Sequence, residues 1–383
     1  MKWKNIGHEY DELAVTICKE NIKYYVWGAG VLGDSFYKDF SQKINIIGFI
    51  DSNPQKQGMR EDGVYIFAPD EVDLQADERI LIATGWLKQV SDVLEKKGYH
   101  RNKEYFLIDE FSAIYMLYKY NKLYIEKMDM MCNTRCTLRC KHCTSLIPYC
   151  RNGRNESFDE MKSCVDMLFQ WVDHVHIFSF SGGDCMLNPD LKKIITYMGA
   201  TYKGEKIRDF ELYTNTIIMP DEEMLELWEK YDVIVRFTDY SKAIPGRQNI
   251  EQMKSLLNEN GLRYDHVQFE HWVDTGYPQE SNGIIGEEAL IAHCKKCSPV
   301  ICTSLYQGKI YYCSPACSAV ASGLYELDET DGFSLDNYRP DRKKEFMEFY
   351  NGYSIKGYPS QCIRCNGLFN TNDKFIIPGE QLS

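Results

Sequence analysis

Three cysteines near the middle of the chain, Cys136, Cys140 and Cys143, lie within one short segment. Their spacing, CxxxCxxC, places three soft sulfur ligands close together. Three thiolates can hold three irons of a four-iron cluster and leave the fourth iron without a protein ligand. Because an iron with an open position can bind and reduce a small molecule, this segment predicts redox chemistry at a cluster.

Two simpler interpretations use the same residues. Positions i, i+4 and i+7 would share one face of a helix, where buried cysteines behave as small apolar residues. That face, however, would carry nothing but sulfur. Structural zinc sites usually take four ligands from two closely spaced pairs, and the local set here stops at three. The spacing therefore favours an iron-sulfur cluster over packing and over zinc.

The segment resembles the signature of the radical S-adenosylmethionine superfamily. CxxxCxxC follows a strand-like stretch at 123–128, and His142 precedes the last cysteine, where that family often has an aromatic residue. The resemblance implies a [4Fe-4S] cluster on Cys136, Cys140 and Cys143 that binds S-adenosylmethionine. It also implies a partial (β/α)6 barrel and an electron donor such as flavodoxin or ferredoxin.

A second part of this resemblance lies one strand further along. Residues 177–184 end a strand with Gly182, Gly183 and Asp184, similar to the family's Gly-Gly-Glu element. Glycine at such a position lets the backbone approach a ligand closely. The resemblance implies that this element binds the methionyl ammonium of the cofactor, although Asp184 is one methylene shorter than the usual Glu.

Two further residues on strands are candidates for cofactor binding. Thr214-Asn215 is similar to the family's Thr-Asn-Gly, which implies that Asn215 approaches the ribose; the alternative is that it caps the next helix or turn. Arg236, on the following strand, could pair with the cofactor carboxylate, because guanidinium and carboxylate match bidentately. A structural salt bridge is the alternative for Arg236.

Strands and helices alternate downstream of the cysteines. Helices are expected at 157–171, 189–197, 220–230 and 250–259, and strands end at 182 or span 209–215, 232–238 and 264–269. Strands separated by single helices imply parallel pairing and right-handed crossovers. The carboxyl ends of such strands share one rim, and the candidate residues from Cys136 to Arg236 are expected there.

The first part of the chain has the pattern of a dinucleotide-binding βαβ unit. A strand at 23–27 is followed by GxGxxG at Gly28, Gly30 and Gly33, a helix toward residue 40, and a strand at 44–50 that ends at Asp51. The glycines would let a pyrophosphate approach the helix N-terminus, and Asp51 would accept hydrogen bonds from a ribose diol. Further strands are expected at 65–67, 79–83 and 105–108.

The same region resembles small Rossmann-like domains found at the front of sugar-modifying and surface-polysaccharide proteins, through Asp-Ser-Asn-Pro at 51–54 and Ala-Pro-Asp-Glu at 68–71. A bound nucleotide or nucleotide-sugar is one expectation. The alternative is a Rossmann fold that has lost its ligand and serves as a docking module.

A second group of cysteines lies beyond residue 285. Cys302 and Cys313 end a predicted hairpin with its turn at 307–308, so they should lie opposite each other with Cβ atoms about 5 Å apart. Cys362 and Cys365 form a CxxC pair. Together they make four sulfur ligands.

These four residues are similar to the ligands of C-terminal extensions called twitch or SPASM domains, which hold an auxiliary [4Fe-4S] cluster. In that family the first ligand usually lies further before the hairpin, a gap that Cys294 or Cys297 satisfies better than Cys302. The alternative is a structural zinc site on the same thiols.

Composition agrees with a large soluble protein. The alternating strands and helices and the resemblance together imply an α/β fold with a Rossmann-like domain at 1–115, a radical S-adenosylmethionine partial barrel at 116–284 and an auxiliary iron-sulfur domain at 285–383. The chain has 383 residues, 44% apolar and 26% charged, and a net charge of -12 that disfavours nucleic acid and anionic membranes. No stretch is long enough to span a bilayer and no signal-peptide pattern begins the chain. Fifteen cysteines in such a chain indicate metal or redox work in the cytoplasm.

Three functions remain open from the sequence. The first is an oxidative radical enzyme that abstracts hydrogen from a carbohydrate or a nucleotide-linked small molecule. The second is a radical enzyme that modifies a peptide, which the auxiliary cluster makes credible. The third is a zinc-stabilised binding protein without catalytic activity.

Overall fold

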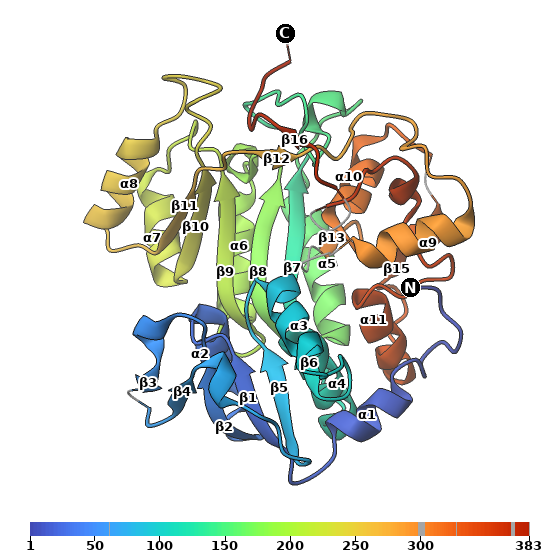
Figure 1. Cartoon of the computed structure of the whole chain (residues 1–383). Helices are drawn as coiled ribbons and strands as arrows, with labels where there is room; N and C mark the ends of the chain where they lie inside the picture. Colours follow the sequence, from blue (N-terminus) through green and yellow to red (C-terminus); the bar gives the residue numbers. More distant parts are fainter. Residues whose placement is uncertain (61, 298–302, 327, 369–371, 383) are drawn as a thin grey trace. The chain divides into compact units, whose positions relative to one another are not determined.

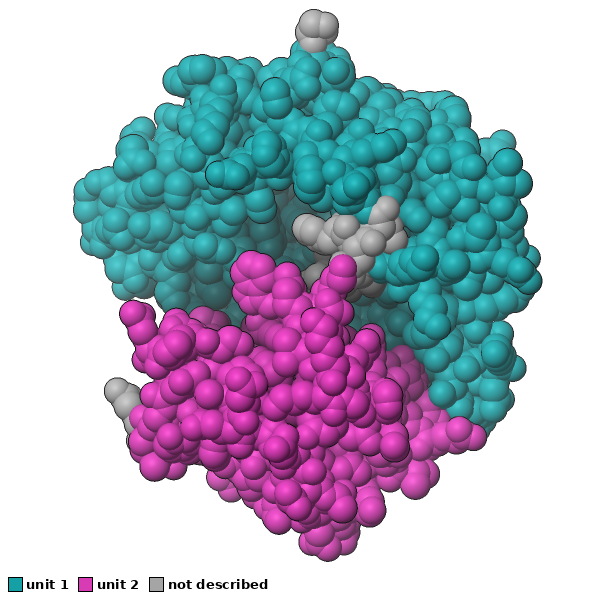
Figure 2. Space-filling model, in the orientation of Figure 1, with its two compact units in different colours: residues 1–9, 123–383 teal, residues 10–122 magenta. Residues whose placement is uncertain are grey.

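The computed structural model describes residues 1–60, 62–297, 303–326, 328–368 and 372–382 (Figure 1). The chain divides into two compact units: a smaller one, Tyr10–Lys122, and a larger one that joins Met1–Glu9 to Leu123–Ser383 (Figure 2). Residues 285–383 fall in the larger unit together with the barrel, whereas the sequence suggested a separate domain. The hairpin described below gives the physical reason.

The smaller unit is a mostly parallel sheet with strand order β3-β4-β2-β1-β5-β6. All neighbours are parallel except β3 and β4. The strands are β1 Lys23–Trp27, β2 Asn45–Ile50, β3 Gly58–Met59, β4 Tyr65–Phe67, β5 Glu78–Ile82 and β6 Tyr105–Leu107. The helices are α1 Asp11–Ile17, α2 Val31–Phe40, α3 Leu87–Lys96 and α4 Ile108–Tyr120. The strand order switches direction at β1, because β2 lies on one side of it and β5 on the other. Ligands of such sheets bind next to this switch point.

The larger unit has an eight-stranded sheet of order β11-β10-β9-β8-β7-β13-β14-β15. Its strands are β7 Tyr124–Asn133, β8 His174–Gly182, β9 Ile207–Thr214, β10 Val233–Thr238, β11 Tyr264–Val267, β13 Ser304–Tyr306, β14 Lys309–Tyr311 and β15 Gly332–Ser334. Strands β7 to β11 are parallel, and Figure 1 shows β7 to β10 as neighbouring arrows. The expected α/β class with parallel strands is confirmed.

Single helices connect these parallel strands. They are α5 Phe158–Trp171, α6 Leu191–Thr201, α7 Glu222–Lys230 and α8 Ile250–Glu259. Helix α5 begins where Ser157 accepts the amide of Glu160 and the Glu160 carboxylate accepts the amide of Ser157, a capping box. Asp221 caps α7 by accepting the amide of Met224. Local side-chain chemistry therefore sets the starts of these helices.

The predicted hairpin in the C-terminal region is present. Strands β13 and β14 pair antiparallel with Tyr306 opposite Lys309, and Gln307 and Gly308 have φ of 46° and 72°, as a tight two-residue turn requires. Strand β13 also pairs in parallel with β7, with Ser304 beside Asp129. This pairing makes the hairpin part of the barrel sheet, so the two regions form one compact unit.

The remaining elements of the larger unit are α9 Glu287–Lys296, α10 Ser314–Ser322, α11 Lys343–Tyr350, and the paired short strands β12 Trp272–Val273 and β16 Phe375–Ile376. Residues 1–9 join this unit because the buried carboxylate of Glu348 accepts hydrogen bonds from the Trp3 indole and from the amides of Gly7 and Glu9. Within the described ranges, every helix is too short or too polar to cross a membrane.

Candidate cluster and cofactor site

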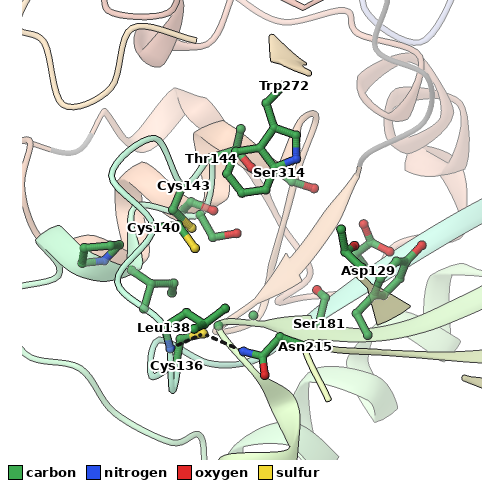
Figure 3. A pocket seen from close by; sticks show the side chains of 18 of the residues that line it. Asp129, Cys136, Leu138, Cys140, Cys143, Thr144, Ser181, Asn215, Trp272 and Ser314 are labelled. Carbon is green, nitrogen blue, oxygen red and sulfur yellow. Dashed lines mark hydrogen bonds between the residues drawn. The ribbon is translucent and has the colours of Figure 1, made fainter. Parts of the chain in front are cut away.

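The three cysteines follow β7 and line a cavity of about 460 Å³ at the carboxyl ends of β7, β8 and β9. Gly182, Gly183 and Asn215, which come from the ends of β8 and β9, line the same cavity. Figure 3 shows Cys140 and Cys143 close together on the cysteine loop, with Cys136 near Asn215. The structure thus brings together six residues that were chosen as candidates from the sequence.

Gly182 and Gly183 are required by the close approach of the cysteine loop. Gly182 has a φ of 139°, and a Cβ atom there would lie 2.4 Å from the carbonyl oxygen of Asn133. A Cβ atom on Gly183 would lie 2.0 Å from the carbonyl oxygen of Arg135. Hydrogen bonds from the Gly183 amide to the Asn133 carbonyl oxygen, and from the Asp184 amide to that of Arg135, join the two segments. The glycine turn therefore sets the height of the cysteine loop above the sheet.

Asp184 is fully buried and is not among the residues that line the cavity. Its Oδ2 accepts hydrogen bonds from the Thr214 hydroxyl and the Asn215 amide, each at 3.3 Å, and its Oδ1 accepts the amide of Met186 at 3.1 Å. Burial raises the pKa of this carboxyl above its ordinary value. In this arrangement the Asp184 side chain positions the end of β9, and a role of this residue in cofactor binding stays a prediction.

Asn215 links the end of β9 to the cysteine loop. Its Nδ2 donates to Cys136 Sγ at 3.4 Å and to the Thr137 hydroxyl at 2.9 Å (Figure 3). Its Oδ1 accepts the amide of Ile217 at 3.1 Å. The side chain therefore caps the turn that follows β9, which is one of the two alternatives left open by the sequence, and it also contacts the candidate cluster ligand Cys136.

Hydrogen-bond donors surround the sulfur atoms of the loop. The Leu138 amide donates to Cys136 Sγ at 3.4 Å, and the side-chain amide of Gln381 donates to Cys140 Sγ at 3.3 Å. Burial raises the pKa of Cys136 to about 12 and that of Cys140 to about 11. Buried thiols of this kind become thiolates when a metal binds them. No feature of the sequence singled out Gln381, because it lies far along the chain from the loop.

Arg236 lies away from the cavity in a network of charges. Its Nε is 2.7 Å from Glu211 Oε1, and its guanidinium also pairs with Asp265. Lys127 Nζ is 2.9 Å from Glu211 Oε2. The structure therefore shows the salt bridge that was the alternative interpretation of Arg236, and this residue does not line the cavity.

A second, smaller cavity of about 40 Å³ is lined by five cysteines of the C-terminal region: Cys294, Cys297, Cys313, Cys362 and Cys365. Backbone amides donate to two of their sulfurs, from Leu368 to Cys297 at 3.4 Å and from Gly367 to Cys365 at 3.3 Å. A hydrogen bond from the Cys362 thiol lowers the pKa of Cys294. Cys302, the predicted first ligand, lies outside the described residues.

Among the residues that the structure describes, no three His, Cys, Asp or Glu side chains are arranged to hold a metal ion. A site for an iron-sulfur cluster has a different geometry from a site for one metal ion. Each thiolate binds its own iron, so the cysteine sulfurs are spread around the cluster. The two groups of cysteines, each lining one cavity, are compatible with that larger group.

In the smaller unit, a cavity of about 660 Å³ opens at the carboxyl ends of β1, β2 and β5 and is lined by Gly28, Gly30 and Asp51 among others. Gly33 lies behind it: a Cβ atom there would be 1.9 Å from the Gly28 carbonyl oxygen. Asp51 accepts the amides of Ala29 and Asn53, at 3.0 and 2.9 Å. These hydrogen bonds tie Asp51 to the glycine turn.

No protein-family model and no curated protein matches the chain. Several solved structures are similar to parts of the chain. Histidine-tagged anSMEcpe with bound AdoMet is 17% identical with a TM-score of 0.30, over 37% of this chain and 42% of that one, so this chain spans less than half of it.

BtrN in complex with AdoMet and 2-DOIA is 11% identical with a TM-score of 0.44, over 66% of this chain and 97% of that one. Streptococcus suis SuiB bound to precursor peptide SuiA is 14% identical with a TM-score of 0.36, over 74% and 82%. These are partial similarities.

Proposed function

We propose that this chain is a radical S-adenosylmethionine enzyme. The observation that carries the proposal is the convergence of Cys136, Cys140 and Cys143 with the Gly182-Gly183 turn and Asn215 on one cavity at the carboxyl rim of a parallel sheet. Three thiolates in CxxxCxxC spacing hold three irons and leave the fourth for a cofactor. When bound, the [4Fe-4S] cluster and S-adenosylmethionine supply a 5′-deoxyadenosyl radical that abstracts hydrogen from the substrate.

The residues of the chain fit such a group. Buried thiols become stable thiolates beside iron, and donors from Leu138, Asn215 and Gln381 face two of the three sulfurs. Hydrogen bonds to the sulfurs help to set the reduction potential of a cluster. Gly182 and Gly183 hold the cysteine loop close to the sheet, and their backbone atoms also line the cavity, where a cofactor could approach them.

Part of the cavity wall is apolar. Apolar side chains of Leu138, Ile147, Phe269, Trp272 and Val273 line the cavity around the cysteines. Apolar walls reduce contact with water and so help to protect a reactive radical from side reactions. Its walls therefore suit chemistry at an unactivated C–H bond.

An auxiliary [4Fe-4S] cluster in the C-terminal cavity is part of the proposal. Cys313, Cys362 and Cys365 are three of its ligands, and Cys294 and Cys297 line the same cavity as candidates for the fourth. An auxiliary cluster can accept the electron left on a substrate radical, so an oxidative reaction is favoured. A zinc ion on the same thiols is the alternative, and metal analysis separates the two.

The substrate that we propose is a small carbohydrate-like molecule. No Lys or Arg is found among the described residues that line the main cavity, so a free phosphate or diphosphate has no cationic partner there. A peptide substrate is the second candidate, because the cavity is open enough to admit a side chain. An electron donor such as flavodoxin or ferredoxin is expected to reduce the cluster.

Anaerobic reconstitution tests the proposal. We expect about eight irons per chain and formation of 5′-deoxyadenosine after reduction. Replacement of Cys136, Cys140 and Cys143 together by Ala should abolish cleavage and remove about half of the iron. Cys150→Ala is the matched control, because this half-buried cysteine flanks the loop without lining the cavity. If both sites bind zinc and S-adenosylmethionine is not cleaved, the proposal is wrong and the chain is a non-catalytic binding protein.

We also propose that the smaller unit binds a nucleotide or nucleotide-sugar. The cavity at the strand ends, the Gly28 turn and the N-terminus of α2 support this, and Lys56 Nζ lies 3.5 Å from Asp51 Oδ2 beside them. Titration with UDP-glucose and NADH tests it. Lys56→Met should weaken binding of either ligand without changing S-adenosylmethionine cleavage, and absence of binding to the wild-type chain would leave a docking module.

A further inference from the structure

A segment far along the chain, residues 372–382, packs against the wall of the main cavity. Its strand β16 pairs with β12, whose Trp272 and Val273 line the cavity, and Figure 1 shows the two strands side by side. Further on, Gly379 lies against Tyr240, another lining residue, so closely that a Cβ atom on Gly379 would be 2.9 Å from Tyr240 Cβ. The segment is therefore held in place before it reaches the cysteine loop.

The next four residues, 379–382, form a strap along the cysteine loop. Cys140 and Gln381 face each other in an antiparallel bridge. Two main-chain hydrogen bonds join the strap to the loop on either side of Cys140: from the Lys141 amide to the Glu380 carbonyl oxygen at 2.7 Å, and from the Leu382 amide to the Arg139 carbonyl oxygen at 2.8 Å. A chain segment tied down in this way has a defined conformation.

The side chain of Gln381 makes three hydrogen bonds at this point. Its Nε2 donates to Cys140 Sγ at 3.3 Å and to the Gly379 carbonyl oxygen at 2.6 Å. Its Oε1 accepts the Arg139 amide at 2.8 Å. Only this orientation of the amide is chemically sensible, because the Arg139 N–H can only donate and the Gly379 carbonyl can only accept. The NH₂ group of Gln381 is therefore fixed against the sulfur of Cys140.

A donor in this position affects both the holding of iron and its reduction. Cys140 is 7% exposed, so water has little access to replace the donor. A hydrogen bond to a thiolate is assisted by the negative charge of the sulfur. Reduction adds a further negative charge to a cluster, so the donor stabilises the reduced form more and raises the reduction potential. Groups that orient a metal ligand from behind also contribute about 10–100-fold to metal affinity.

We infer that Gln381 is a positioning residue of the cluster site, which orients Cys140 and stabilises the charge on its sulfur. The inference rests on the proposed function, because Cys140 must bind an iron of the cluster. It deepens that function by assigning part of the site to a residue 241 positions further along the chain. The strap and the loop then form one cluster-binding unit.

Redox titration and iron release to a chelator, both on the reconstituted chain, test this role. Gln381→Leu keeps a side chain of similar size without a donor, and Gln381→Glu places a carboxylate oxygen beside the sulfur. We expect iron loss on the order of tenfold faster in Gln381→Leu. The reduction potential should fall in Gln381→Leu and fall further in Gln381→Glu. The signal of this cluster is the one that disappears when Cys136, Cys140 and Cys143 are all replaced by Ala.

Gln268→Leu is the matched control, because this exposed side chain donates to Asp239 at 3.0 Å and does not line the cavity. An unchanged potential in both Gln381 variants, or the same shift in Gln268→Leu, would overturn the inference, even if the Gln381 variants have a lower Tm. Cleavage of S-adenosylmethionine is measured on the same samples. A shifted potential in a wild-type cluster that never cleaves S-adenosylmethionine would refute the radical enzyme and leave the role of Gln381 standing.

Discussion

Gly183→Ala is the substitution that tests most directly how the glycine turn supports the cysteine loop. The new Cβ would lie 2.0 Å from the Arg135 carbonyl oxygen, whereas real Cβ contacts are essentially never under 3.0 Å. The loop must therefore move by about 1 Å, the difference between these distances, directly before Cys136. Metal-ligand distances tolerate only about 0.2 Å, so we expect loss of most of the loop's iron.

The cost to stability is modest by comparison. Overpacking of this kind costs about 1–3 kcal/mol, and each kcal/mol lowers the Tm by about 2–4 °C in a domain of roughly 150–250 residues. The assays are iron content after reconstitution, 5′-deoxyadenosine formation and thermal unfolding. Gly85→Ala is the control, since a Cβ there meets nothing within 4 Å and its φ lies outside the left-handed region. Full iron loading and cleavage in Gly183→Ala would refute the view that this glycine positions the loop.

Three further predictions concern the cysteines and the charged network. Asn215→Asp replaces the donor that faces Cys136 by an acceptor, so we expect a lower reduction potential or loss of iron, measured by redox titration and iron analysis. Glu211→Gln should cost about 3–5 kcal/mol at pH 7 by breaking a buried ion pair. Burial opposes ionisation of Glu211, but Lys127 and Arg236 outweigh burial and lower the pKa of this carboxyl. The ion pairs of Glu211 therefore stabilise the fold fully above pH 4.5, and this stabilisation is lost as the pH falls below that value. The difference in Tm between wild type and Glu211→Gln should shrink at acidic pH. Either Cys294→Ala or Cys297→Ala should lose auxiliary iron while Cys302→Ala keeps it, and loss of auxiliary iron in Cys302→Ala alone would make Cys302 the ligand.

Local structure was largely predictable from the sequence. The strand at Lys23–Trp27 and the turn at Gln307-Gly308 were predicted at the residues where they occur, because apolar runs and turn residues act over short distances. Helix α5 begins after Ser157, as its capping box indicates. These features depend on neighbours a few residues away, which a sequence pattern records directly.

Long-range contacts were harder to predict. The pairing of β13 with β7 places the C-terminal hairpin in the same sheet as the barrel strands. Neither sequence segment contains a pattern that predicts this pairing. The same applies to Gln381 beside Cys140 and to Arg236, which packs among carboxylates instead of facing the cavity. Such contacts arise from packing of distant segments, and no local pattern encodes them.

The ladder between β7 and β13 has a consequence for electron transfer. Strand β7 leads into the loop with Cys136, and the β13–β14 hairpin leads into Cys313. The β7–β13 and β13–β14 pairings therefore join the strands that precede the two groups of sulfurs, and these strands stay side by side unless the sheet itself opens. If both proposed clusters form, the separation between them is then held by this sheet, and the rate of electron transfer between them should stay constant while the substrate binds and leaves.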